Sequence, residues 1–390
     1  MRNKSPDKSP DKSRNLLQTK AQRWVVKIGS SLLTDEGRGL DRKSIGGWVR
    51  QIIALRRSGI EVILVSSGSV SAGVQRLGWS QRPANLKERQ AAASVGQSAL
   101  IHTYEKLLRE CDEPNEMPIH CGQVLLTHDD LRSRRRYLNA RSALLTLLEM
   151  NVLPIINEND TVSYNAINLG DNDTLAAVVS NLLDADLLVI LTDQDGVFNA
   201  DPRSNPDAQL LTEVNAGAAM LERIAGSGGS GVGTGGMLAK VRAATRAARS
   251  GTSTIIANGR CDNVLLRIRD GEALGTFIHA RLPKLDARKR WLAGHLRARG
   301  TLHLDAGAVH ALKQDGGSLL PVGVTALEGN FHRGDLVLCK DPDGNVFARG
   351  LVNWDANVVQ RCLGKKSAEI ADDPDVAEGV MIHRDNLLIH

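Results

Sequence analysis

Apolar stretches alternate with longer amphipathic stretches along residues 24–280. The apolar stretches are nearly continuous in Val, Ile and Leu, which is typical of strands that are covered on both faces. We expect such strands at residues 24–29, 61–68, 152–160, 186–193 and 252–259. Helical patterns lie between them, at residues 42–58, 86–110, 131–150, 172–183 and 236–250. This alternation predicts an α/β fold with a doubly wound, mainly parallel sheet that is sandwiched by helices.

The predicted strands end in Gly, Ser, Asn or Asp. In doubly wound sheets, ligands bind outside the carboxyl ends of the strands. The polar residues that follow the strands therefore mark this edge of the sheet as the candidate site.

The pattern changes after residue 280. Residues 281–296 have the composition of a linker, and from residue 297 short alternating runs are separated by turn signals such as the sequence DPDG. These features predict a small β-rich domain at residues 297–380, which leaves residues 23–280 for the α/β domain. Residues 1–22 are rich in Lys, Ser, Pro and Asp, and we expect them to form a disordered basic tail.

The formal net charge of +5 first suggests a nucleic-acid partner. However, the first 23 residues hold seven Lys or Arg and only two Asp, so the remaining chain is formally neutral. Aromatic residues make up only 3% of the chain, which disfavours surfaces that stack bases. We therefore expect no nucleic-acid partner, and we interpret the arginine-rich segment 132–141 as a solvated helix face.

The cysteines and the hydropathy indicate the compartment. Five cysteines without a CxxC pair fit a reducing environment. No apolar run approaches the ~18–20 residues that span a bilayer, and no apolar segment of a signal peptide follows the basic N-terminus. We expect a cytoplasmic protein without a membrane partner.

A glycine-rich loop at residues 226–236 leads into a predicted helix that carries Lys240. Such a loop offers free backbone N–H groups and the positive end of a helix dipole, which together suit a phosphate. The spacing of Gly231, Gly233 and Gly236 matches GxGxxG, but a helical stretch precedes it where a dinucleotide site needs a strand. A phosphate site and a surface loop both remain possible from this feature alone.

Two strand ends carry groups that suit anions. Lys27 lies among Val and Ile near the end of the first predicted strand, where a buried lysine is unusual unless it is paired or functional. A lysine that extends to water explains this position equally well, but the Gly-Ser-Ser that follows supplies further donors. Ser66, Ser67 and Gly68 follow the second strand in the same way.

Two clusters of carboxylates and amides lie about ten residues apart, at residues 157–160 and 170–174. Asp and Asn at a helix start are often caps, which is one interpretation of Asp171. The other is that the clusters bind an ammonium group or orient nearby lysines.

Taken in chain order, these motifs resemble the amino acid kinase family. The resemblance covers residues 24–296 and rests on the segments LNAR, INEND, GDND, LTDQ, ADPRSNP, GTGGM and RKRW. None is specific alone, but INEND, GDND and GTGGM in one chain are. The C-terminal part resembles the PUA domain that is attached to many such kinases.

The resemblance implies that the γ-phosphoryl group of ATP is transferred to the γ-carboxylate of L-glutamate, which gives L-glutamyl 5-phosphate in the first step of proline biosynthesis. A side-chain carboxylate has a pKa near ~4.3, so the nucleophile is already ionised at neutral pH and needs no general base. The reaction needs in-line positioning, Mg²⁺ and positive charge instead.

The resemblance also implies roles for individual residues. Catalytic roles fall to Lys27, Lys240 and Asp173, and glutamate binding falls to Ser67, Asp160, Asp171 and Asn172. The ATP-binding positions are Lys27, Thr192, Asp193, Thr234, Gly235, Gly236, Met237, Leu238, Ala239 and Lys240. We expect no metal ligand from the protein, because Mg²⁺ prefers to keep water and phosphate ligands.

Further expectations follow from the resemblance: a homo-oligomer, feedback inhibition by proline and transfer of the product to glutamyl-phosphate reductase. Two departures from the family pattern are Asn168, where relatives often have Lys, and an apparent insertion at residues 111–120. One alternative is another amino acid kinase, acting on acetylglutamate, aspartate or a nucleotide monophosphate. RNA binding through the PUA-like domain is a second alternative, which the ten basic and thirteen acidic residues of 297–390 disfavour.

Overall fold

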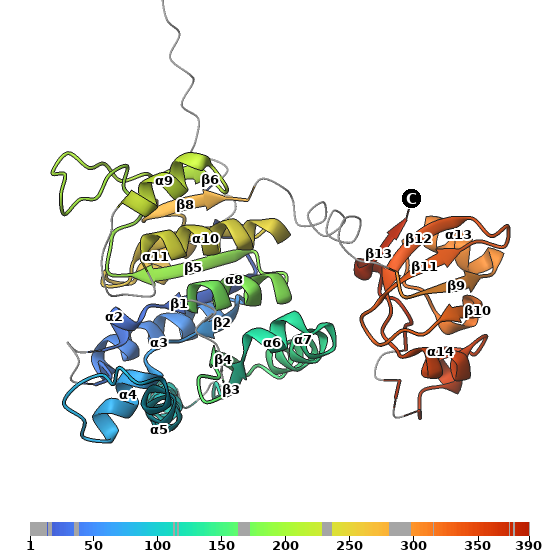
Figure 1. Cartoon of the computed structure of the whole chain (residues 1–390), viewed down its shortest axis with the longest axis horizontal. Coiled ribbons are helices and arrows are strands. Elements are labelled where there is room, and N and C mark those ends of the chain that lie inside the picture. Colours follow the sequence, from blue (N-terminus) through green and yellow to red (C-terminus); the bar gives the residue numbers. More distant parts are fainter. Residues whose placement is uncertain are drawn as a thin grey trace, which may run out of the picture. The chain divides into compact units, whose positions relative to one another are not determined.

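Figure 1 shows a computed structural model of the chain, whose described residues form two compact units, each with its own sheet. The described residues are 14, 18–34, 39–111, 114, 117–162, 172–227, 236–280, 298–314, 316–373, 375–376 and 379–389. No helix among them is long and apolar enough to cross a membrane. The domain boundaries expected from the sequence remain predictions.

The N-terminal unit contains an eight-stranded sheet in the order β3-β4-β2-β1-β5-β7-β8-β6. Its pairs are parallel except for β7 and β8, which confirms the mainly parallel sheet. The strands are β1 (Arg23–Ile28), β2 (Glu61–Val65), β3 (Cys121–Leu126), β4 (Leu153–Glu158), β5 (Leu187–Thr192), β6 (Glu213–Asn215), β7 (Ser253–Asn258) and β8 (Thr276–His279).

All five predicted strands form, while β3, β6 and β8 add to the sheet. The sequence gives weak signals for these three because β6 and β8 span only three and four residues. Strand β3 is only partly buried along most of its length, so it lacks the continuous apolar run of a central strand.

Helices form in all five segments where the sequence predicts them, and the structure adds further helices outside these segments (Figure 1). The helix expected over 131–150 is divided into two at Ser133, and the one expected over 236–250 ends in a short 3-10 turn, η1 (Ala248–Ser250). The helices are α2 (Ser30–Leu33), α3 (Arg42–Arg57), α4 (Ser69–Arg76), α5 (Leu86–Arg109), α6 (His128–Arg132), α7 (Arg134–Glu149), α8 (Asn172–Leu182), α9 (Ala219–Ser227), α10 (Met237–Ala247) and α11 (Val264–Arg269).

Alternation along β1 decides which side chains enter the core and which face the site. Trp24, Val26 and Ile28 join one hydrophobic cluster with residues of α3, α5 and α11. Because successive side chains of a strand point to opposite faces, Val25 and Lys27 lie on the other face. Helix α8 packs on β1 there, so Lys27 is directed toward α8.

The N-terminal segment differs from the sequence-based expectation. Arg14 is buried and donates from Nη1 to the carbonyl of Thr212, at 3.2 Å, and from Nη2 to the carbonyl of Leu274, at 2.6 Å. Gln18 is buried as well and donates to the carbonyl of Glu272. The prediction of a disordered tail up to residue 22 is therefore wrong for these residues. Composition concealed this packing, because the contacts are made by polar side chains with backbone carbonyls.

The C-terminal unit has a five-stranded sheet in the order β10-β9-β11-β12-β13, which confirms the small β-rich unit. Leu302, Phe331, Val337 and Trp354 contribute to its separate core. Among the described residues of this unit, two helices accompany the strands, together with the 3-10 turns η2 (Pro321–Gly323), η3 (Ser367–Glu369) and η4 (Arg384–Asn386). The longer elements are β9 (Gly300–Leu304), α13 (Ala306–Gln314), β10 (Val324–Gly329), β11 (Leu336–Lys340), β12 (Val346–Leu351), α14 (Ala356–Cys362) and β13 (Leu387–Ile389).

Candidate active site

A buried group of three charged side chains lies where β1, α8 and α10 meet. Nζ of Lys27 is 2.6 Å from one carboxylate oxygen of Asp173, and Nζ of Lys240 is 2.9 Å from the other. The side chain of Asp173 is 0% exposed, and those of Lys27 and Lys240 are 5% and 7% exposed. One carboxylate thus orients two lysines that come from segments more than 200 residues apart.

The group keeps a net positive charge. Burial acts to raise the pKa of the Asp173 carboxyl, but the charges of Lys27 and Lys240 outweigh burial and lower it. Asp173 is therefore ionised at neutral pH, and two ammonium groups face one carboxylate. Two lysines that converge on one carboxylate in this way suit a site at which an anion binds.

Helix α10 positions Lys240 in its first turn. The helix begins at Met237 after Gly236, whose backbone is extended and which has no side chain to cap the first N–H groups. Lys240 is the fourth residue of the helix and lies about one turn after Gly236, so its side chain reaches back toward this helix end. Leu238 and Ala239 are half-buried in the same turn.

The side-chain amide of Asn172 connects the ends of two strands. It donates from Nδ2 to Oγ of Ser67, at 3.0 Å, and to Oδ1 of Asn157, at 2.8 Å. The carbonyl of Ser66 also lies within hydrogen-bond distance of the same nitrogen, so its two hydrogens are shared among three acceptors. Since Asn172 is the residue before Asp173 in α8, these contacts fix the helix that carries the carboxylate.

Asp160 follows β4 and accepts a hydrogen bond from Oγ of Ser69, at 3.2 Å. Ser69 starts α4 after Gly68, whose φ of 93° is a left-handed conformation that favours glycine. Burial raises the pKa of the Asp160 carboxyl, although Ser69, Arg82 and Arg89 act to lower it. Asp160 is thus a carboxylate without a close cationic partner in the described hydrogen bonds and ion pairs.

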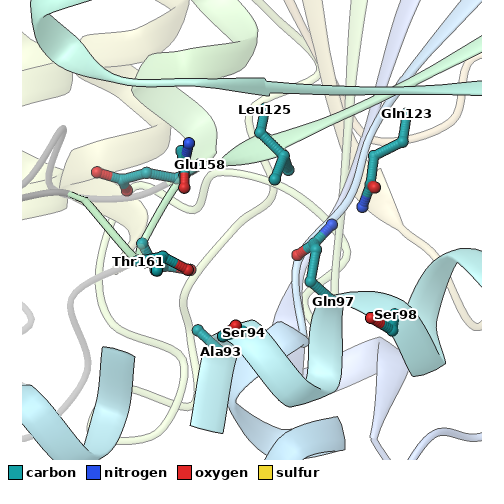
Figure 2. A pocket seen from close by; sticks show the side chains of 10 residues that line it. Ala93, Ser94, Gln97, Ser98, Gln123, Leu125, Glu158 and Thr161 are labelled. Carbon is teal, nitrogen blue, oxygen red and sulfur yellow. The ribbon is translucent and has the colours of Figure 1, made fainter. Parts of the chain in front are cut away.

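Asp160 also lines a cavity of about 180 Å³ between α5, β3 and the end of β4 (Figure 2). The lining is mostly polar and consists of Ala93, Ser94, Gln97, Ser98, Gln123, Leu125, Glu158, Asn159, Asp160 and Thr161. This volume is adequate for a small polar molecule or several waters.

Comparisons with known proteins show the family to which the chain belongs. Residues 22–258 match the sequence profile of the amino acid kinase family. The glutamate 5-kinase of Pseudomonas syringae pv. tomato is 54% identical over 372 residues, which cover 95% of this chain and 98% of that protein. The glutamate 5-kinase of Stutzerimonas stutzeri is 53% identical over 375 residues, with the same coverage of 95% and 98%. The chain belongs to the amino acid kinase family.

The C-terminal unit carries a PUA domain, since residues 300–373 match the profile of that domain. Among solved structures, the carbamate kinase of Giardia lamblia aligns with a TM-score of 0.49 and 16% identity, over 67% of this chain and 99% of that chain.

In this amino acid kinase, the described structure brings part of the predicted site together. Lys27, Asp173 and Lys240 form one contact group, and Ser67 joins Asn172 in a second. Thr192 ends β5, where its hydroxyl donates to the exposed carboxylate of Asp193, at 3.0 Å. No described hydrogen bond connects Thr192, Asp193 or the first turn of α10 to the predicted glutamate-binding residues Ser67, Asp160 and Asn172. Asp171, Thr234 and Gly235, together with Asn168, lie outside the described residues.

Two polar partners were not anticipated from the sequence of this kinase. Gln97 accepts a hydrogen bond from Nδ2 of Asn157, at 2.9 Å, and Tyr104 lies 3.0 Å from the hydroxyl of Ser66. Both belong to α5, which the sequence predicts only as an amphipathic helix. No motif identifies them, because their importance depends on the packing of α5 against the strand ends.

The arginine-rich segment is only partly the solvated face that we expected. Arg135 and Arg136 are exposed, but Arg141 donates to the carbonyl of Leu182 and to Asp184. Among the described residues, no cluster of three or more His, Cys, Asp or Glu has the arrangement of a metal site.

Proposed function

We propose that this protein transfers the γ-phosphoryl group of ATP to the γ-carboxylate of L-glutamate, producing L-glutamyl 5-phosphate as the first step of proline biosynthesis. The relatives that match nearly the whole chain are glutamate 5-kinases. The observation that carries the proposal is the buried group of Lys27, Asp173 and Lys240. It supplies positive charge at the edge of the sheet where a carboxylate and a triphosphate must meet.

The reaction places two anions in contact. An oxygen of the γ-carboxylate forms a bond to the γ-phosphorus, while the bond from that phosphorus to the bridging oxygen breaks and ADP leaves. The carboxylate is ionised at neutral pH, so no side chain has to remove a proton. The two lysines lower the repulsion between the anions and stabilise the charge on the transferred group. Asp173 holds both ammonium groups in place before the substrates arrive.

The acceptor side is formed by Ser67, Asp160 and Asn172. Asp160 supplies a carboxylate for the ammonium group of glutamate, and the hydroxyl of Ser67 supplies a donor for its carboxylates. The NH₂ group of Asn172 is bonded within the protein, which leaves its amide oxygen as a further acceptor for the ammonium group. We extend the acceptor site to Asp171, as the family pattern implies. A ligand ammonium would give Asp160 the cationic partner that its half-buried carboxylate lacks in the described contacts.

We assign the nucleotide to Lys27, Thr192, Asp193 and the run from Thr234 to Lys240. The first turn of α10 offers N–H groups to phosphate oxygens, and Lys240 adds a charge at the same helix end. Mg²⁺ would be held mainly by the phosphates, and it supplies further neutralisation of charge when it is bound. The proposal also includes a cytoplasmic homo-oligomer that is inhibited by proline and transfers its product to glutamyl-phosphate reductase.

A hydroxamate-trapping assay tests the substrate. Hydroxylamine converts an acyl phosphate into a hydroxamate, so ATP, Mg²⁺ and each candidate acceptor are incubated separately with the purified chain. We expect hydroxamate with L-glutamate and little with L-aspartate or N-acetyl-L-glutamate. Product with aspartate but not with glutamate would overturn the assignment in favour of another amino acid kinase.

The same assay tests the role of the buried group of Lys27, Asp173 and Lys240. Lys240→Ala removes one of the two paired ammonium groups, and we expect kcat to fall on the order of 10²-fold. Lys106→Ala, at an exposed position of α5, is the matched control and should leave kcat unchanged. An unchanged kcat in Lys240→Ala would remove Lys240 from the reaction.

A further inference from the structure

We propose that Gln97 is a positioning residue for the acceptor side of the site. In this proposal, which rests on the function above, Gln97 fixes the amide of Asn157, and Asn157 in turn fixes Asn172. The three side chains form a continuous chain of hydrogen bonds from α5, through the end of β4, to the start of α8.

The amide of Asn157 is buried and has a definite direction. Its Oδ1 accepts from the backbone N–H of Glu158, at 2.9 Å, and from Nδ2 of Asn172, at 2.8 Å. Its Nδ2 donates to Oε1 of Gln97, at 2.9 Å. A reversed amide would place its NH₂ group against two other N–H donors. The backbone N–H of Glu158 thus sets the orientation in which Asn157 presents oxygen to Asn172, and Gln97 supplies the acceptor that this orientation requires for the buried Nδ2 of Asn157.

Close packing of α5 holds Gln97 in place. A Cβ added to the neighbouring Gly96 would lie 1.8 Å from the carbonyl oxygen of Ser69 in α4, and one added to Gly73 of α4 would lie 1.7 Å from the carbonyl oxygen of Ala92. The backbones of the two helices thus touch at these glycines. Ser69 is also the residue that donates to Asp160, so one helix contact positions both Gln97 and the partner of Asp160.

The position of Gln97 also links the chain of amides to the cavity. Figure 2 shows its side chain extending from α5 toward β3, where Gln123 points back into the same space. Of the three amide side chains, that of Gln97 lines this cavity, whereas Asn157 and Asn172 are not among its described lining residues.

Loss of the Gln97 acceptor should affect glutamate more than ATP. The buried Nδ2 of Asn157 would lack its partner, which favours entry of water and loosens the side chain of Asn157. Asn172 would then lose a fixed acceptor in Oδ1 of Asn157, while its contacts with Ser66 and Ser67 remain. Lys27 and Lys240 make no described hydrogen bond to these amides, so the nucleotide side should keep its geometry.

The test is steady-state kinetics of Gln97→Met, which keeps the length of the side chain and removes both polar atoms. We expect KM for glutamate to rise about tenfold, with KM for ATP unchanged. Gln123→Met is the matched control, because it makes the same chemical change across the cavity and Gln123 has no described bond to Asn157. An unchanged KM for glutamate in Gln97→Met would overturn the proposal.

A double-mutant cycle tests whether Gln97 acts through Asn157. In an Asn157→Ala background, Gln97→Met should produce no further rise in KM for glutamate. A full additional rise would show that Gln97 acts by another route and would overturn the proposal. If Gln97→Met fails to fold, Gln97→Ala is measured in the same cycle.

Failure of the role of Gln97 can be distinguished from failure of the assignment of glutamate as the substrate. If the unmodified chain gives no hydroxamate with glutamate, the proposed function fails. If it does give hydroxamate and Gln97→Met matches it at every glutamate concentration, only the role of Gln97 fails.

Discussion

The two sides of the site are built from different chemistry. The phosphoryl side has three buried charges, with Asp173 between two lysines at 2.6 and 2.9 Å. The acceptor side consists of amides and hydroxyls around Asn172, with Asp160 as its carboxylate. In the proposed function, the charged side neutralises the anions that meet there, and the amide side supplies directional hydrogen bonds. The proposal thus assigns rate enhancement to one side and recognition of the amino acid to the other.

The two aspartates of the site, Asp173 and Asp160, differ in the direction of their pKa shifts. Burial acts to raise the pKa of both carboxyl groups, yet the pKa of Asp173 is lowered by its lysines and that of Asp160 stays raised. The difference lies in the partners, because Asp160 has only a hydroxyl donor at 3.2 Å and more distant arginines. Asp173 has its counter-charges within the protein, whereas in the proposed function the ammonium group of glutamate supplies one for Asp160.

Asp173→Asn should have the largest effect. The substitution keeps the size of the side chain but removes the negative charge that contacts both buried lysines. We expect kcat to fall by about 10³-fold, because neither lysine is held in position. We also expect a loss of about 3–5 kcal/mol in the free energy of unfolding at neutral pH, since one partner of a buried ion pair is removed. Denaturant unfolding and the hydroxamate assay measure the two effects.

The stability effect of Asp173 has a defined pH dependence. Its pKa is lower in the folded chain than in the unfolded chain, so its contribution is present above the unfolded pKa of about 3.9. The contribution is lost as the pH falls through the folded pKa. The stability difference between the original chain and Asp173→Asn should therefore shrink in acid. A constant difference down to the lowest pH would contradict the assigned ion pairs.

Asp160→Asn should have an intermediate effect and act on the other side of the site. We expect KM for glutamate to rise about 10- to 100-fold, because a charged partner of the ammonium group is lost. The original chain should show the same loss at acidic pH, as protonation of Asp160 at its raised pKa removes the charge. The variant should lack this acidic limb in a plot of KM against pH.

The contribution of Asp160 to stability depends on pH in the opposite direction to that of Asp173. Because the pKa of Asp160 is raised on folding, its contribution is present below about pH 3.9 and is lost as the pH rises through the folded pKa. Asp160→Asn should therefore be at least as stable as the original chain at neutral pH while binding glutamate more weakly. A marked loss of stability at neutral pH would place Asp160 in the fold rather than in substrate recognition.

The phosphoryl side was more predictable from the sequence than the acceptor side. Lys27 stands out because a charge interrupts an apolar strand, and Lys240 because it follows a glycine-rich loop by one helical turn. The distance between the two lysines was not predictable, since Asp173 brings them together only in the folded chain.

Gln97 and Tyr104 show the limit of sequence patterns in this chain. Both are ordinary residues of a long amphipathic helix, and neither lies in a motif. Their roles depend on the close contact of α4 and α5 at Gly73 and Gly96, a tertiary feature that local patterns do not encode. Arg14 is a similar case, because a polar segment gave no sign that its guanidinium is buried.

Tyr104→Phe should have a smaller effect than Asp173→Asn or Asp160→Asn. It tests whether the acceptor side extends as far as Tyr104. Tyr104 is fully buried, and its hydroxyl lies 3.0 Å from that of Ser66, whose own carbonyl accepts from Asn172. Burial raises the pKa of the Tyr104 phenol, so the hydroxyl stays neutral. Ser66 retains a second contact through its hydroxyl, to the carbonyl of Ser67. We therefore expect a loss of about 0.5–1.5 kcal/mol in the free energy of unfolding, with KM for glutamate unchanged. Chemical denaturation and kinetics on one preparation measure both, and a tenfold rise in KM would extend the acceptor side to Tyr104.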